Sequence, residues 1–223
     1  MSASPLFAGL SDADRNALQR RAQLCKFAAG ETLFAQGDAA DKLFVITKGR
    51  VKVWRASEDG GALTLTLLGR GQPIGTLGAA EGRLNHATAT AVTPVEAFAW
   101  PIEGLRQLMD ASPPLAANVL HTVTNYAEQL IERLEEVSSV PVEQRIARTL
   151  LRMARRTYGE EAADGCELPL SRQDLADLTS ATLPTVSRIM SRWRGERWIA
   201  GTRGRVRLLN MAALVRLTER PAC

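Results

Sequence analysis

The chain has few of the residues that build disulfide frameworks or metal centres. Its 223 residues include 3 cysteines and 2 histidines, and Cys25, Cys166 and Cys223 lie far apart. Sparse, widely spaced cysteines are typical of reduced intracellular thiols and exclude a disulfide scaffold or a zinc knot. No apolar run approaches the ~18 residues of a membrane span, and the first residues lack the pattern of a signal peptide. We therefore expect a cytoplasmic protein with no membrane partner and no bound metal.

Charge of one sign gathers at the C-terminal end. Residues 141–223 carry 15 arginines and no lysine against 9 acids, whereas residues 1–140 carry 13 basic and 15 acidic residues. A basic C-terminal third predicts a polyanionic partner such as nucleic acid. The histidines are far apart and no nucleophile is paired with a base, so the sequence predicts no catalytic residue and no enzyme.

Short apolar runs separated by glycines fill residues 30–100. The runs include TLFAQG, KLFVITKGRVKVW, LTLTLLG and ATATAVTPVEAFAW. Many short strands with regularly spaced glycine turns predict an antiparallel barrel or roll. The preceding SDADRNALQRRAQ predicts a short helix capped by Ser11. Together these segments predict a sensor domain at residues 1–112.

The hydrophobic period changes after Pro113 and Pro114. Apolar residues then recur at spacings of three and four: Leu120, Val123, Ala127, Leu130, Leu134 and Val137. About three heptads of this pattern favour a coiled-coil seam with a second copy of the same helix. The alternative is a helix packed on its own barrel. We assign residues 113–140 to a dimerisation helix, with Pro141 as a hinge before a third domain at residues 141–223.

Residues 170–194, LSRQDLADLTSATLPTVSRIMSRWR, contain two short amphipathic segments around a small-residue break. Ser171 followed by Asp174 predicts a capped first helix, and Thr179–Ala181 a tight turn. Thr182 then caps a second helix, in whose first turn Pro184 costs little. The spacing of Val186, Ile189, Met190 and Trp193 predicts one buried stripe.

The opposite face of the second helix is polar and basic. It carries Thr185, Ser187, Arg188, Ser191 and Arg192. Small side chains allow close approach to a major groove, arginine pairs bidentately with guanine, and flanking arginines hold phosphates. The following RWIAGTRGRVRLL predicts a β-hairpin wing with arginines 203, 205 and 207 near its turn. The alternative, a helical hairpin with a solvated basic face, does not explain this hairpin.

Nearly the whole chain resembles the CRP/FNR superfamily of bacterial transcription regulators. The resemblance is carried by GETLFAQGDAADKLFVITKGRVKVW, by GRGQPIGTLGAAEGRLNHATATAV, by the seam helix and by SRQDLADLTSATLPTVSRIMSRW. It implies an α+β fold: a cyclic-nucleotide-binding-like antiparallel β-roll, a long dimerisation helix and a C-terminal winged helix-turn-helix. It also implies a homodimer on a near-palindromic operator in double-stranded DNA, working with RNA polymerase.

The resemblance assigns roles to the helix-turn-helix. The arginine matching Arg188 contacts a guanine, and the positions matching Ser171, Arg172 and Gln173 meet phosphates. The family's usual glutamate falls at Pro184, which removes the acceptor for a cytosine amino group and predicts a different half-site. The predicted DNA contacts are Ser171, Arg172, Gln173, Thr182, Pro184, Thr185, Ser187, Arg188, Arg192 and Arg203.

The predicted effector pocket departs from the cyclic-AMP branch of the family. Its residues are Gly75, Thr76, Leu77, His86, Ala87, Leu130 and Ile131. The family's Gly-Glu pair falls at Gly75-Thr76 and its Arg-Ser pair at His86-Ala87, while its hydroxyl contacts to adenine fall at Leu130 and Ile131. At these positions the chain lacks the family's acceptor for the ribose, its permanent positive charge and its hydroxyls. We therefore expect no dependence on cyclic AMP.

Other effectors of the superfamily fit no better. An iron–sulfur cluster needs about four thiolates, and the N-terminal region offers only Cys25. Haem would have to use His86 or His121, a loop residue and a seam-flanking residue. A small apolar or anionic ligand, or none, stays open, as do the operator, the regulated genes and activation versus repression. The competing function is a regulatory module that acts through a protein partner instead of DNA.

Overall fold

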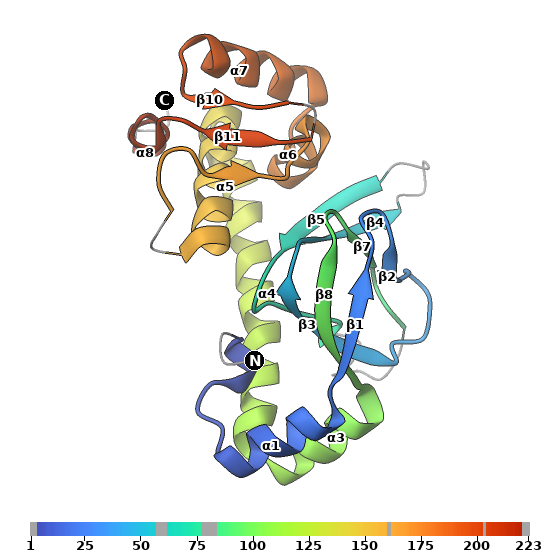
Figure 1. Ribbon diagram of the computed structural model, residues 1–223. Coiled ribbons are helices and arrows are strands. Elements are labelled where there is room, and N and C mark those ends of the chain that lie inside the picture. The colour runs from blue at the N-terminus through green and yellow to red at the C-terminus, as the bar shows by residue number, and fades with distance from the viewer. Residues whose placement is uncertain (1–3, 57–61, 77–83, 160–161, 203, 220–223) are drawn as a thin grey trace. The chain divides into compact units, whose positions relative to one another are not determined.

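The structure is a computed structural model that describes residues 4–56, 62–76, 84–159, 162–202 and 204–219. Internal contacts divide the chain into two units, Met1–Glu128 and Gln129–Cys223. The long helix α4 (Pro113–Ser139) contributes residues to both units (Figure 1). None of the described helices combines the length and the apolar character that are needed to cross a membrane.

Two antiparallel four-stranded sheets form the roll in the described part of the first unit. One sheet has the order β1 (Gln23–Phe27), β8 (Val95–Pro101), β3 (Lys42–Lys48) and β6 (Pro73–Ile74). The other has the order β2 (Thr32–Phe34), β7 (Thr88–Ala91), β4 (Val51–Ala56) and β5 (Ala62–Leu68). The predicted antiparallel roll is confirmed, and it begins one strand earlier than residue 30, because β1 pairs with β8.

Strand β3 explains why the run LFVI is continuously apolar. Phe44 and Ile46 lie in the cluster between the sheets, whereas Leu43 and Val45 lie in a second cluster on the outer face. Successive side chains of a strand point to opposite faces, so a strand covered on both faces needs apolar residues at every position. The sheet is therefore buried from both sides at β3.

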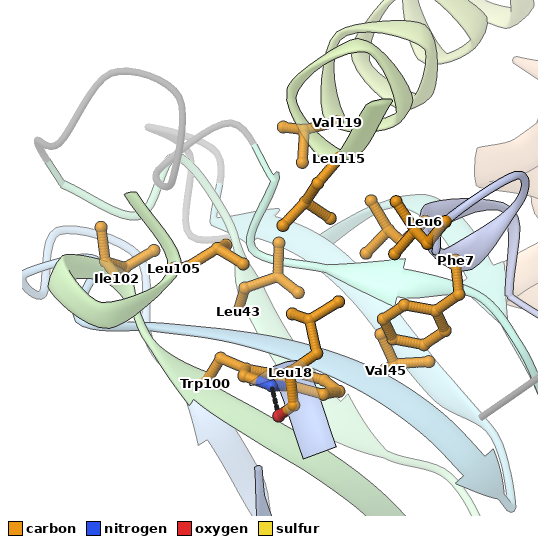
Figure 2. Close-up of a cluster of buried hydrophobic side chains, with 11 residues drawn as sticks. Leu6, Phe7, Leu18, Leu43, Val45, Trp100, Ile102, Leu105, Leu115 and Val119 are labelled. Carbon is orange, nitrogen blue, oxygen red and sulfur yellow. Dashed lines mark hydrogen bonds between the residues drawn. The ribbon is translucent and has the colours of Figure 1, made fainter. Parts of the chain in front are cut away.

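Three helical segments and the start of α4 build the second cluster. They are η1 (Pro5–Phe7), α1 (Asp12–Arg21) and α3 (Ile102–Ala111). Figure 2 shows Trp100 among these side chains, with its indole Nε1 donating to the Leu18 carbonyl over 2.8 Å. The Ser11 side chain accepts from the Asp14 amide, which confirms the predicted cap of α1. Leu115 and Val119 anchor the first half of α4 in the same cluster.

The second unit is built around helix α5 (Val142–Tyr158). It packs against α6 (Arg172–Thr179), α7 (Leu183–Gly195) and α8 (Met211–Thr218). A small antiparallel sheet has the order β10 (Ile199–Ala200), β11 (Val206–Leu208) and β9 (Glu167–Leu168). Ile146 and Leu150 of α5 are fully buried. Burial of one face of α5 thus fixes the platform for the two short helices.

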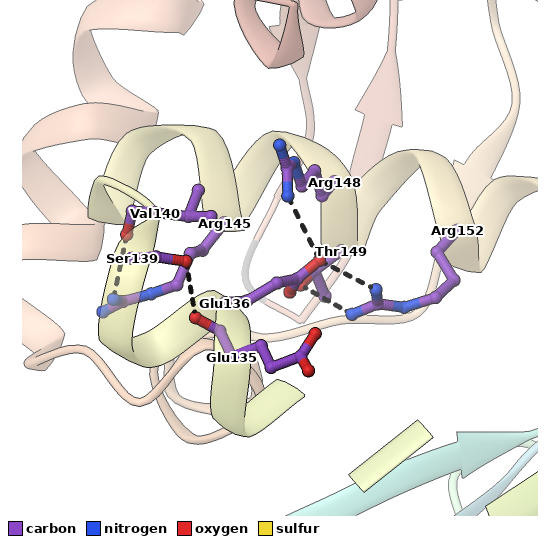
Figure 3. A network of polar contacts seen from close by, with 8 residues as sticks. All are labelled: Glu135, Glu136, Ser139, Val140, Arg145, Arg148, Thr149 and Arg152. Atoms are coloured by element: carbon purple, nitrogen blue, oxygen red, sulfur yellow. Dashed lines mark hydrogen bonds and ion pairs between the residues drawn. The ribbon is translucent and has the colours of Figure 1, made fainter. Parts of the chain in front are cut away.

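A polar network holds the last turns of α4 on α5 (Figure 3). Glu136 lies 3.4 Å from Arg152 and 3.9 Å from Arg148. Arg145 is buried and donates to the carbonyls of Val137 and Val140 over 3.0 and 3.1 Å. Burial lowers the pKa of Arg145, against the opposing effect of Glu136. A buried guanidinium thereby satisfies two carbonyls at the end of a helix, where intrahelical partners are missing.

Candidate nucleic-acid interface

Helix α6 begins with a complete capping box. The Ser171 hydroxyl accepts from the Asp174 amide over 3.0 Å, and the Asp174 carboxylate accepts from the Ser171 amide over 2.9 Å. This confirms the cap that the sequence predicted. Gln173 donates to Asp177 over 2.7 Å, and Arg172 makes a long contact of 3.5 Å with the Ser191 hydroxyl. Ser171 thus caps α6, and Arg172 and Gln173 lie in its first turn.

The break between the two helices is a tight turn, as predicted. Ser180 adopts the left-handed region with φ 49°, and its amide bonds back to the end of α6. The Thr179 hydroxyl donates to the Leu175 carbonyl over 2.6 Å, and the Ala181 amide donates to the Ala176 carbonyl over 2.9 Å. The bonds from the Ser180 and Ala181 amides satisfy carbonyls that the end of a helix leaves open.

Helix α7 is capped by Thr182, whose side chain accepts from the Thr185 amide, and Pro184 lies in its first turn. Its inner face is buried, as the sequence predicted: Val186, Ile189, Met190 and Trp193. The outer face presents Arg188, Ser191 and Arg192 as exposed residues, with Thr185 and Ser187 half-buried beside them. The helical period thus separates a buried apolar stripe from a basic, solvent-facing one.

A carboxylate that the sequence did not single out clamps α7 onto α5. The Trp193 indole Nε1 donates to Glu143 Oε1 over 2.9 Å, and Arg192 forms an ion pair with the same oxygen. The hydrogen bond to Glu143 raises the pKa of Arg192, and Glu196 lies 3.9 Å away as a second acid. Arg192 therefore already has partners within the domain. The available sequence signal was an acid in the first turn of the helix after Pro141.

Arg188, unlike Arg192, has no acidic partner among the described residues. No side chain among the described residues pairs with it, and the same holds for exposed Arg194. An open hollow of about 670 Å³ lies between the wing, the start of α6 and the side of α7 that carries Leu183, Ser187, Met190 and Arg194. Arg172, Ser187 and Arg194 contribute to its lining. The guanidinium of Arg194 and the small side chain of Ser187 at this hollow suit an anionic partner, because basic side chains and hydroxyls donate to phosphates.

The wing consists of β10 and β11, which pair antiparallel with Ile199 opposite Leu208. The hairpin confirms the predicted wing, and β9 adds a third strand that the sequence did not reveal. Arg205 lies 2.6 Å from Glu167, and Arg207 donates from Nε to the Gly165 carbonyl over 3.1 Å. Arg203, the predicted wing contact, lies outside the described residues. Two of the three wing arginines are thus tied to the β9 segment.

The predicted effector residues fall in both units. Thr76 and Ala87 are buried in the first unit, Gly75 adopts φ +88°, and His86 is exposed. Leu77 lies outside the described residues. Leu130 and Ile131 belong to the second unit and are exposed on α4. Within the described ranges, no group of three or more histidine, cysteine, aspartate or glutamate side chains is placed to hold a metal ion.

The two units match two known domain families. A winged helix-turn-helix with a basic outer face defines a protein of the double-stranded-DNA-binding class. Residues 24–112 match the cyclic nucleotide-binding domain, and residues 144–217 match the Crp-like helix-turn-helix domain. The chain is 31% identical to the global nitrogen regulator of Synechococcus elongatus over 86% of this chain and 88% of that protein. It therefore belongs to the CRP/FNR superfamily and is a transcriptional regulator that binds DNA through its helix-turn-helix.

Further relatives agree with this assignment. The CRP-like cAMP-activated global transcriptional regulator of Mycobacterium tuberculosis is 26% identical over 87% of each chain. The structure of TTHB099, a CRP-family transcriptional regulator from Thermus thermophilus, superposes with a TM-score of 0.72 at 25% identity, covering 89% of this chain and 98% of that one. FixK2 from Bradyrhizobium japonicum shares the fold, with a TM-score of 0.76 at 20% identity over 90% and 99% of the two chains. The expectation of a non-enzymatic protein is confirmed by this family.

The Glu143 clamp predicts a loss of stability in the second unit. Glu143→Ala removes the acceptor for both Trp193 and Arg192 and should lower the free energy of unfolding by about 1–3 kcal/mol. Glu143→Gln keeps an acceptor for Trp193 and should lose less. Guanidinium unfolding followed by tryptophan fluorescence measures both. Equal transitions for the wild type and Glu143→Ala would show that the clamp contributes nothing.

Proposed function

We propose that the protein is a homodimeric, sequence-specific regulator that reads a near-palindromic operator with α7 and acts on RNA polymerase in the cytoplasm. The observation that carries the proposal is exposed Arg188, which lies on the outer face of α7 without a partner among the described residues. The major groove of DNA admits an α-helix, and a free arginine on such a helix, next to small Ser187, can reach the O6 and N7 atoms of a guanine.

The other cations have distinct roles in this proposal. Arg172, at the first turn of α6, holds a phosphate next to the hollow, because helix N-termini and basic side chains both attract anions. Arg194, on the same hollow, holds another. Arg192 serves mainly to seat α7, because Glu143 and Glu196 already neutralise it. Base reading and phosphate holding are thus assigned to different residues.

The proposed dimer forms through α4. Leu120, Leu130 and Leu134 expose 64%, 60% and 68% of their surface, and Ile131 exposes 58%. Large apolar side chains along a coiled-coil spacing are costly in water and are covered by a second copy of the helix. Two copies then present two recognition helices to half-sites about one helical turn apart.

The proposed regulator does not depend on cyclic AMP. Buried Thr76 has no carboxylate to accept from a ribose hydroxyl, and buried Ala87 has no hydroxyl for the phosphate. Exposed His86 stands at the position where the cyclic-AMP branch of the family has an arginine. The name of the Mycobacterium tuberculosis relative states activation by cyclic AMP, so this chain would differ from that relative in its effector.

Substitution of the base-reading arginine should change sequence preference. Arg188→Ala is expected to weaken operator binding by about 1–3 kcal/mol and to flatten the preference at one base pair of each half-site. Binding is measured by fluorescence anisotropy on operator and random duplexes.

Arg172→Ala is the matched control for this experiment. It should weaken both duplexes alike and lower the slope of log K against log salt by about 0.9 for the lost phosphate contact. An equal loss for Arg188→Ala on operator and random DNA would refute base reading by Arg188.

Charge within the α4 seam should prevent assembly. Leu134→Glu places a carboxylate among the exposed apolar residues and should give monomers, because burying an unpaired charge costs several kcal/mol. Sedimentation velocity measures the oligomeric state. Glu132→Gln, on the outward position of the same helix, should leave the dimer intact. A Leu134→Glu protein that sediments as the wild type would contradict the seam.

Cyclic AMP should neither bind nor alter DNA binding. Isothermal titration calorimetry of the wild type with cyclic AMP is expected to show no binding heat up to millimolar nucleotide, and operator affinity should be the same with and without it. A micromolar dissociation constant, equivalent to about −8 kcal/mol, would contradict the pocket argument.

A further inference from the structure

The first turn of α7 exposes carbon where the rest of its outer face exposes polar groups. Leu183 exposes 42% of its surface, and neighbouring Pro184 is exposed as well. A single exposed leucine is ordinary on a protein surface. This leucine, however, lines the same hollow as Ser187 and Arg194, next to the surface of α7 that we propose to face DNA. Its position, and not its exposure alone, makes it informative.

The two threonines of this turn contact each other. The hydroxyls of Thr182 and Thr185 lie 2.9 Å apart, and the Thr185 amide donates to the Thr182 hydroxyl over 3.4 Å. Pro184 has no backbone N–H to offer. The turn therefore exposes the Leu183 side chain and the Pro184 ring beside two threonine hydroxyls that are bonded to each other.

The apolar pair lies close to the proposed base-reading arginine. On a helix, residues four apart share a face, which places Leu183 beside Ser187 and Pro184 beside Arg188. Four residues span about 6 Å of helix, and base pairs are stacked at about 3.4 Å. A helix that brings Arg188 to one base thus brings Leu183 and Pro184 to a base within about two steps.

We propose that Leu183 and Pro184 select a thymine in each half-site through its 5-methyl group. The methyl of thymine is the apolar group that base edges offer in the major groove, and cytosine lacks it at the same position. Adenine and guanine would instead place polar atoms against carbon, where they lose water without gaining a partner. The inference deepens the proposed function and rests on α7 reading the operator.

The test removes the methyl from the DNA and the side chain from the protein. The operator is first selected from random duplexes by the full-length protein, and each half-site thymine is then replaced singly by deoxyuridine. Wild-type affinity should fall about fourfold at one position within two base pairs of the guanine, as expected for one methyl. Leu183→Ala should bind thymine and deoxyuridine duplexes with affinities that differ less than twofold.

A second exchange separates the methyl from hydrogen bonding. Replacing that T·A pair by C·G should weaken wild-type binding, and 5-methylcytosine at the same position should restore part of the loss. Arg188→Ala should keep the sensitivity to deoxyuridine while losing the guanine preference. Pro184→Ala gives an independent measure of the proline contribution.

The outcomes distinguish this inference from the proposed function. If the protein selects an operator with an Arg188-dependent guanine, but no deoxyuridine substitution near it changes affinity, the thymine contact is wrong and the function stands. A selected half-site with no thymine within two base pairs of the guanine would also show that the thymine contact is wrong while the function stands. If no sequence is selected at all, the proposed function fails, and the thymine contact fails with it.

Discussion

Burial of one face of α7 against α5 is the constraint on which the DNA-binding surface depends. Trp193 is fully buried, and its indole N–H is satisfied by Glu143. A helix has a period of 3.6 residues, so fixing Val186, Ile189 and Trp193 inward leaves Arg188 no orientation other than outward. The free guanidinium that supports base reading is therefore a consequence of a buried indole and of the carboxylate that satisfies it.

Helix α4 meets two different demands along its length. Leu115 and Val119 are buried in the core of the first unit, whereas the large apolar residues from Leu130 onward are exposed. The polar side of its last turns is held on α5 by Glu136 and Arg145 (Figure 3). One helix thus contributes to the core of the first unit and to a polar network of the second, and its exposed apolar residues are the physical basis of the proposed dimer.

Features governed by local chemistry were predictable from the sequence. Capping by Ser11, Ser171 and Thr182 depends on neighbouring residues, and the stripe of α7 depends on period alone. Strand β1 was missed because it is only five residues long and its partner β8 lies far along the chain. Glu143 was missed because it meets Trp193 across 50 residues of sequence. No local pattern encodes such a pairing.

The sequence by itself determined the roll, the capped helix pair, the wing and the family, because turn residues, caps and hydrophobic periods act over a few residues. Only the tertiary structure decided which arginines are available to a partner. Arg188 and Arg192 lie on the same face and cannot be told apart by spacing, yet Arg192 is paired with Glu143 and Arg188 is not. Likewise, the exposure of Leu183 follows from where α7 packs. Whether an arginine is free to bind DNA depends on which acids the fold brings next to it. The spacing of residues along the sequence does not give the distance between such partners.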